Sequence, residues 1–212
     1  MRRRMSVARP RVGIILTGGG ARAAYQVGVL RAIAELVPRE AGNPFPIISG
    51  TSAGAINAVA LAADAVNFRR AVLRLQAVWK NFHAEQVYRA DPLGVLANSA
   101  RWITSALTGG RLGAEPTALL DNAPLRKLLS ERVQFDAIQR CIDAGHLYAL
   151  AITCSGYASG QSVSFFQGAP DAQPWKRARR IGVQMPIRLE HLLASSAQPF
   201  IFPPVRINRE FF

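Results

Sequence analysis

The sequence feature that most constrains the fold is Gly50-Thr51-Ser52-Ala53-Gly54, which follows an apolar run and precedes small residues. The Gly-x-Ser-x-Gly pattern is typical of a sharp strand-to-helix turn that raises a serine hydroxyl above the edge of a sheet. Glycines flank the serine because a Cβ at either position would clash where strand and helix meet. The pattern predicts a strand over residues 46–48, a helix over 53–63 and a nucleophilic Ser52.

The same five residues also fit a less specific alternative, a buried serine in a glycine-containing turn. The neighbouring sequence favours the nucleophile. Residues 46–48 are short, apolar and β-branched, which suits a buried strand. The alanine-rich run that follows carries Ile56, Val59 and Ala60 on one helical face.

A glycine loop lies one strand earlier. Residues 12–16 predict a buried strand, Thr17-Gly18-Gly19-Gly20-Ala21-Arg22 a loop, and residues 23–37 a helix that ends at Pro38. A helix N-terminus presents free N–H groups and the positive end of its dipole. Glycines let the main chain close tightly on an anion. The segment therefore predicts an anion-binding loop.

Two anions fit this loop. Gly18-x-Gly20-x-x-Ala23 matches a relaxed dinucleotide-binding pattern, with Glu35 or Glu40 as the acidic residue further on. The other anion is the oxyanion of an acyl-transfer intermediate. A βαβ unit brings the glycine loop and the Ser52 turn to one sheet edge, which favours the oxyanion. A third interpretation is that the glycines only allow close helix packing.

The paired motifs resemble those of the patatin-like phospholipase family. The similarity runs from about Arg11 to the end, and it includes Ala194-Ser195-Ser196-Ala197, Pro199 and Phe202-Pro203-Pro204-Val205. It implies a three-layer α/β/α fold, related to the α/β-hydrolases, with a mainly parallel central sheet. It also implies hydrolysis of lipid ester bonds by a Ser–Asp dyad that needs no histidine, metal or cofactor.

Matching the motifs residue by residue assigns the nucleophile to Ser52. Ala23 stands where the family often has glycine, which is a mild departure. The other implied site residues are oxyanion-hole or turn residues: Gly18, Gly19, Gly20, Arg22 and Ala53 for the oxyanion hole, and Gly50 and Gly54 for the elbow.

The base is the main departure from the family. The family's aspartate lies in an Asp-Gly motif after a strand like residues 205–208, and this sequence has no Asp-Gly dipeptide. We expect a fragment that ends before its aspartate and has little turnover alone. A Ser-His-Asp triad with His191 and Asp171 is an alternative. Asp64 is unsuitable, because twelve helical residues would place it roughly 18 Å from Ser52.

The net charge limits the classes of partner to expect. The chain has 26 Lys and Arg against 13 Asp and Glu, a net charge of +13. This excess favours anionic partners. No nucleic-acid motif surrounds the basic clusters at residues 2–4 and 176–180. The resemblance implies a lipid or phospholipid substrate, and the charge adds an expected peripheral contact with an anionic membrane, not with nucleic acid. Two cysteines, Cys141 and Cys154, imply no disulfide framework and favour a cytoplasmic protein.

The remaining sequence predicts one domain over residues 12–212 after a flexible basic leader, residues 1–11. Further helices are expected at 67–82, 92–107, 125–133, 135–144 and 187–197, with strands at 147–153, 162–166 and 205–207. The 92–107 helix is a candidate lid. Two rival functions stay open: a Rossmann-type dinucleotide-binding domain, and a non-catalytic membrane-associated fragment.

Overall fold

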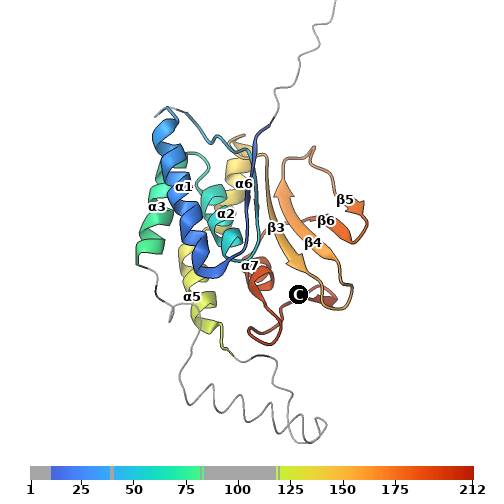
Figure 1. The fold of residues 1–212 in the computed structure, drawn as a ribbon. Helices are drawn as coiled ribbons and strands as arrows, with labels where there is room; N and C mark the ends of the chain where they lie inside the picture. Colours follow the sequence, from blue (N-terminus) through green and yellow to red (C-terminus); the bar gives the residue numbers. More distant parts are fainter. Residues whose placement is uncertain (1–10, 39–40, 82, 84–117, 119) are drawn as a thin grey trace, which may run out of the picture.

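The fold is built on a central mixed sheet, shown in Figure 1. The structure is a computed structural model, and it describes residues 11–38, 41–81, 83, 118 and 120–212. Within these residues the sheet order is β1-β2-β3-β4-β6-β5. Its strands are β1 (Gly13–Leu16), β2 (Ile47–Gly50), β3 (Ala149–Ser155), β4 (Ser162–Gly168), β5 (Trp175–Arg177) and β6 (Arg180–Gln184). A separate hairpin pairs β7 (Arg206–Ile207) with β8 (Glu210–Phe211).

The strand directions place the loops that matter. β1, β2 and β3 are parallel, β4 is antiparallel to β3, β6 is parallel to β4, and β5 is antiparallel to β6. Parallel strands all end at the same edge of a sheet. The loops after β1, β2 and β3 therefore share one edge, which we call the carboxyl edge.

The helices of the described chain are α1 (Ala23–Leu36), α2 (Ala53–Ala63), α3 (Phe68–Lys80), α5 (Ala123–Arg132), α6 (Phe135–Asp143) and α7 (Leu189–Ser196), with a short 3-10 helix, η1 (Gly20–Arg22). α2 packs on β1 and β2, α7 on β3 and α6 on β4, while α1 and α3 cover α2 (Figure 1). No helix among the described residues is both long and apolar enough to cross a bilayer.

Small residues explain why α2 lies at the centre. Ala55, Ala58 and Ala62 are fully buried, since α2 sits between the sheet and the α1–α3 pair. A helix enclosed on most sides needs apolar or small residues all round. α3 is different, because only one face is buried, through Phe68 and neighbouring apolar residues. The alanine-rich sequence of α2 thus lets it approach the sheet closely.

Most predicted elements are present, with shifted ends. The strands expected at residues 147–153 and 162–166 form the antiparallel β3–β4 pair. Cys141 and Cys154 are buried free thiols. β5, β6 and β8 were not predicted. The 92–107 helix with its lid role lies outside the described residues, as do residues 1–10 of the leader expected over residues 1–11.

Candidate active site

Ser52 sits on a strained turn between β2 and α2. Its main chain has φ 54° and ψ −128°, a region that residues with a side chain rarely adopt. The Ala55 N–H donates to the Ser52 carbonyl at 2.8 Å and so opens α2. The Ser52 side chain is half-buried rather than enclosed in the core.

The two glycines of the turn lie where a side chain has no room. A Cβ on Gly50 would come within 2.6 Å of the Ala55 Cα. A Cβ on Gly54 would lie 2.1 Å from the Leu16 carbonyl oxygen. The close approach at Gly54 is therefore between α2 and the end of β1, a strand that the local sequence pattern did not implicate.

The glycine loop after β1 lies against the nucleophile. A Cβ on Gly18 would be 3.2 Å from the Ser52 Cβ and 4.0 Å from its Oγ. Gly20 has φ 55°, a left-handed conformation that favours glycine. Within the described chain, the N–H groups of Gly18, Gly19, Gly20 and Ala53 donate to no other group. Free main-chain donors therefore lie in the glycine loop, whose Gly18 is next to Ser52, and at the start of α2, directly after Ser52.

A buried polar network, which the sequence patterns did not predict, holds the glycine loop. Asn57 is fully buried in α2, and its Nδ2 donates to the Ala23 carbonyl at 3.1 Å and to Gln26 Oε1 at 3.0 Å. Gln26 Nε2 in turn donates to the Thr17 carbonyl at 2.7 Å. Trp79 Nε1 on α3 donates to Asn57 Oδ1 at 2.8 Å. The sequence signal that could have indicated this network is the Asn57 side-chain amide, which stands among the small and apolar residues of α2.

A second missed residue, Ser195, comes from α7. The Ser52 N–H donates to Ser195 Oγ at 2.8 Å, and Ser195 Oγ donates to the Thr153 carbonyl at 2.7 Å. The sequence motif around Ser195 carried the family resemblance, but it predicted no role for this hydroxyl. The contact joins α7 to both the nucleophile turn and β3.

No described carboxylate lies within hydrogen-bond distance of Ser52 Oγ, which has no hydrogen-bond partner in that part of the chain. Asp64 caps the far end of α2, as expected, where Arg70 and Arg74 pair with it. The hydrogen bond with Asp64 raises the pKa of Arg70. Asp64 is therefore a structural ion-pair partner.

The triad alternative is wrong on geometry. Asp171 pairs with Arg11 at 3.8 Å, next to the start of β1, so it lies at the edge of the sheet opposite Ser52. His191 is 1% exposed, and its Nδ1 accepts the Arg188 N–H at 2.9 Å. Burial lowers the pKa of His191. His191 thus caps the start of α7.

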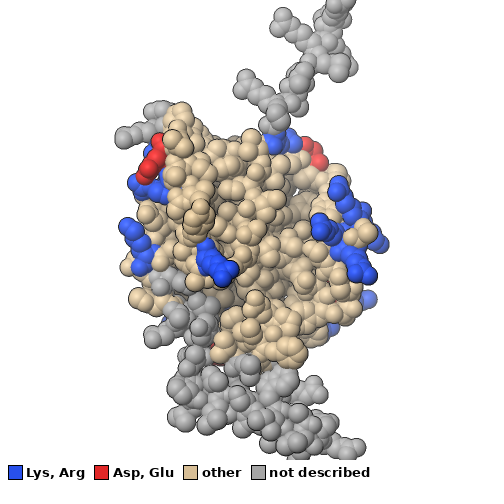
Figure 2. Space-filling model, in the orientation of Figure 1, with Lys and Arg blue, Asp and Glu red and all other residues tan. Residues whose placement is uncertain are grey.

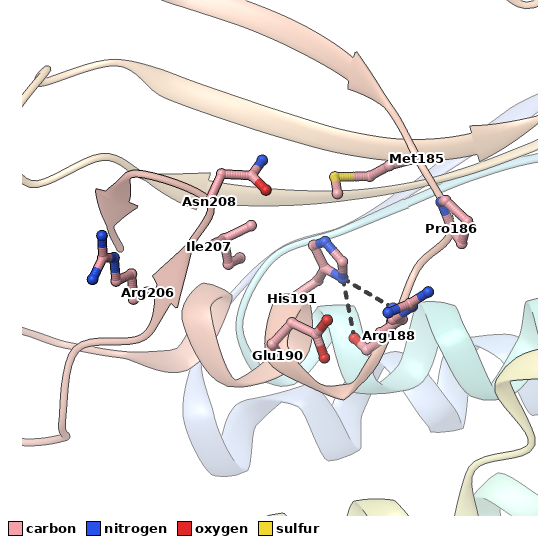
Figure 3. A pocket seen from close by; sticks show the side chains of 8 residues that line it. All are labelled: Met185, Pro186, Arg188, Glu190, His191, Arg206, Ile207 and Asn208. Carbon is pink, nitrogen blue, oxygen red and sulfur yellow. Dashed lines mark hydrogen bonds between the residues drawn. The ribbon is translucent and has the colours of Figure 1, made fainter.

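A separate cavity of about 260 Å³ lies beside α7 and β7, as Figure 3 shows. His191 projects from α7 into this cavity, and its Nδ1 bonds to the Arg188 main chain. The lining residues are Met185, Pro186, Arg188, Glu190, His191, Arg206, Ile207 and Asn208. Neither Ser52 nor the glycine loop contributes to it, so this cavity is distinct from the candidate active site.

The dinucleotide interpretation has little support in the fold. Glu35 pairs with Arg31 at 2.6 Å near the end of α1, one helix length from the glycine loop. Glu40 lies outside the described residues. β2 leads into the Ser52 turn instead of an acidic residue. Among the residues described, no group of three His, Cys, Asp or Glu side chains is arranged to hold a metal ion.

Comparison with known families tests the resemblance found in the sequence. The family model described as patatin-like phospholipase matches residues 14–212. The chain belongs to the patatin-like phospholipase family. This membership confirms the predicted fold class, an α/β fold with a mainly parallel central sheet. It is consistent with a three-layer α/β/α arrangement, in which the described helices that pack directly on the sheet form the layer on one face.

Individual relatives agree with the family match. A cGAMP-activated phospholipase of Pseudomonas aeruginosa is 29% identical over 199 residues, which is 94% of this chain and 50% of that protein. Lysophospholipase nte1 of Aspergillus terreus is 52% identical over 54 residues, 26% of this chain and 3% of that protein. A patatin-like phospholipase domain-containing protein of Caenorhabditis elegans is 51% identical over 45 residues, 21% of this chain and 3% of that protein. The chain thus spans half or less of each of these relatives.

Proposed function

We propose that this chain carries the nucleophile and the oxyanion hole of a serine acyl hydrolase that cleaves lipid esters in the manner of a phospholipase A. Membership of the patatin-like phospholipase family supports lipid hydrolysis in general. One observation carries the finer assignment. The glycine loop contacts the strained serine, because a Cβ added to Gly18 would lie only 3.2 Å from the Ser52 Cβ.

In the proposed reaction, Ser52 Oγ attacks the ester carbonyl carbon and gives its proton to a carboxylate base. Negative charge then develops on the carbonyl oxygen. The free N–H groups of the glycine loop and of Ala53 stabilise that charge. The intermediate collapses with protonation of the leaving alcohol, and water hydrolyses the acyl-enzyme. Arg22, which is exposed at the end of the loop, helps to hold the loop or to polarise it.

We further propose that the base is an aspartate beyond Phe212, acting in a Ser–Asp dyad. The β7–β8 hairpin supports this. Phe212 exchanges two main-chain hydrogen bonds with Val205, at 2.9 and 3.0 Å, and the Tyr157 N–H donates to the Phe211 carbonyl at 2.8 Å. Tyr157 belongs to the loop after β3, so residue 212 lies near the carboxyl edge. This position supports the proposal, because a residue soon after Phe212 would begin near the edge at which Ser52 lies.

A serine-directed fluorophosphonate tests the nucleophile in the full-length protein. We expect labelling at Ser52, because an activated serine reacts with such probes. Ser52→Ala should abolish labelling and esterase turnover. Ser196→Ala is the matched control, since the Ser196 hydroxyl has no partner in the described chain and should leave labelling unchanged. Labelling that persists in Ser52→Ala would refute the assignment.

We also propose that an anionic membrane surface contacts the β5–β6 hairpin. Figure 2 shows Lys and Arg gathered over this part of the molecule. We call it the basic hairpin; its exposed cations, none in an ion pair within the described chain, are Lys176, Arg177, Arg179 and Arg180. Each cation near an anionic surface contributes about 1 kcal/mol.

The strand register supports this orientation. Ser155 at the end of β3 pairs with Ser162, Ser162 pairs with Arg180, and Arg180 pairs with Arg177. The turn of the basic hairpin therefore lies at the carboxyl edge of the sheet. Ser52 is at the same edge, so a membrane held there would present lipid on the side of the nucleophile.

Co-sedimentation with vesicles, with and without phosphatidylserine, tests the membrane contact. Arg177→Gln combined with Arg180→Gln should weaken salt-sensitive binding roughly 30-fold, from about 2 kcal/mol for two cations. Arg132→Gln with Arg140→Gln removes the same charge from exposed positions on α5 and α6 and serves as the control. Equal losses in both double variants would show a general charge effect and exclude this docking surface.

A further inference from the structure

Ser195 fills a gap that opens where β2 leaves the sheet. The last paired residue of β2 is Gly50, which lies opposite Ile152, and β3 continues beyond that point. Thr153 therefore has no partner residue on β2. The Ser195 hydroxyl takes that place, because it donates to the Thr153 carbonyl at 2.7 Å and accepts the Ser52 N–H at 2.8 Å.

The chemistry of a hydroxyl fixes the direction of both bonds. A serine has one O–H donor and two acceptor lone pairs. The Thr153 carbonyl and the Ser52 amide can each play only one role, so the single proton of Ser195 goes to Thr153. Ser195 consequently has no hydrogen left to donate to a substrate. The Ser52 N–H is occupied as well, which removes it from the set of free donors beside the nucleophile.

Ser52 needs such restraint because its main chain is in an unfavourable conformation. A φ of 54° with ψ −128° persists only where the surroundings determine it from several directions. The Thr51 N–H donates to the Leu16 carbonyl at 3.1 Å, which fixes the residue before the nucleophile. Ser195 fixes the nucleophile itself, from 143 residues further along the chain.

We propose that Ser195 is a positioning residue, which holds the Ser52 main chain in its strained turn and leaves oxyanion binding to the glycine loop and Ala53. This inference rests on the proposed acyl-hydrolase function. Removing the hydroxyl frees the Ser52 amide and the Thr153 carbonyl and lets the nucleophile turn relax. Small displacements of a nucleophile reduce turnover strongly, whereas substrate binding at a distance is little affected.

Kinetics of the full-length protein on a short-chain ester provide the first test. Ser195→Ala should lower kcat by roughly 10- to 100-fold with KM changed less than about threefold. Ser195→Thr keeps the hydroxyl and should recover most of the lost kcat. Ser196→Ala, one residue away on the same helix, should match the wild type. A kcat for Ser195→Ala within about twofold of Ser196→Ala would overturn the proposal.

Hydrogen exchange of the Ser52 amide, followed by NMR, provides a test that needs no activity. The amide should be protected in the wild type, Ser195→Thr and Ser196→Ala, and should lose protection in Ser195→Ala. If Ser195→Ala does not fold, Ser195→Cys replaces it, since sulfur is a weak acceptor of similar size, and partial loss is expected. Loss of protection without any esterase activity in the wild type would reject the hydrolase and keep the main-chain contact. Unchanged protection would reject the role of Ser195.

Discussion

The two sides of Ser52 are held by different kinds of interaction. Toward β1 and α2 the restraint is steric, since main chain meets main chain at Gly50 and Gly54, and Gly18 lies against the Ser52 side chain. Toward α7 the restraint is a pair of hydrogen bonds through Ser195. The steric restraint is recognisable in the sequence, because it requires glycines at fixed spacings. The hydrogen-bonded side depends on a residue that only the folded chain brings near.

Substitutions on the steric side of Ser52 should destabilise the protein most. Gly54→Ala places a methyl group 2.1 Å from the Leu16 carbonyl oxygen, so β1 or α2 must move. We expect a loss of roughly 3 kcal/mol or more in the free energy of unfolding, measured by urea denaturation. Gly28→Ala is the matched control, because it is also a helical glycine but has no atom within 4 Å of an added Cβ. That change should stabilise by about 0.5–1 kcal/mol. Similar results for the two variants would contradict the steric account.

Asn57→Leu tests whether the glycine loop depends on more than sterics. The change removes the three hydrogen bonds that Asn57 makes to α1 and α3 and leaves buried polar groups unpaired. We expect roughly 2–4 kcal/mol of destabilisation in chemical denaturation, together with weaker fluorophosphonate labelling of Ser52 in the full-length protein. Asn81→Ala, at the exposed end of α3, should cost less than about 1 kcal/mol. If Asn57→Leu has no larger effect than the control, close packing alone holds the loop.

The α7 side should show a smaller, pH-dependent effect through His191. Burial lowers the pKa of His191 in the folded protein. The charge of Glu190 raises this pKa, whereas Arg188 raises it through a main-chain hydrogen bond and lowers it through its charge. Arg206 lines the same cavity as His191. Unfolded histidine therefore binds a proton more readily, and stability falls as the pH drops below about 6.5. The slope from this one residue is at most about 1.4 kcal/mol per pH unit. His191→Gln should flatten the stability curve between pH 7.5 and 5.5, as measured by denaturation at each pH. An unchanged slope would show that other groups cause any acid destabilisation.

The sequence predicts the steric side of Ser52, formed by β1 and α2, because the residues that determine it are local in the sequence. The extents of α2 and of β1 follow from apolar periodicity and glycine positions. The boundary of α7 was less accurate, since residues 187–197 were expected and the helix spans Leu189–Ser196. Side-chain hydrogen bonds explain why α7 begins two residues later than expected. Gln167 Oε1 accepts the Ile187 N–H and His191 Nδ1 accepts the Arg188 N–H, so both main-chain groups are satisfied before the helix begins.

The basic hairpin was missed for a different reason. Four of the five residues from 176 to 180 are cationic, and the turn uses Arg179 with φ 55° instead of a glycine. Neither the apolar pattern of a strand nor the usual turn residues are present. Pairing with β4 stabilises β6, and this pairing joins residues distant in the sequence. The roles of Asn57 and Ser195 were hidden in the same way, because their partners come from other elements.

The free donors beside Ser52 are main-chain amides, and this has a consequence for how substitutions in that loop act. Replacing a side chain deletes no amide hydrogen unless the new residue is proline. Systematic mutagenesis of residues 18–20 would therefore chart which shapes the loop tolerates, because its capacity to donate is carried by the polypeptide itself.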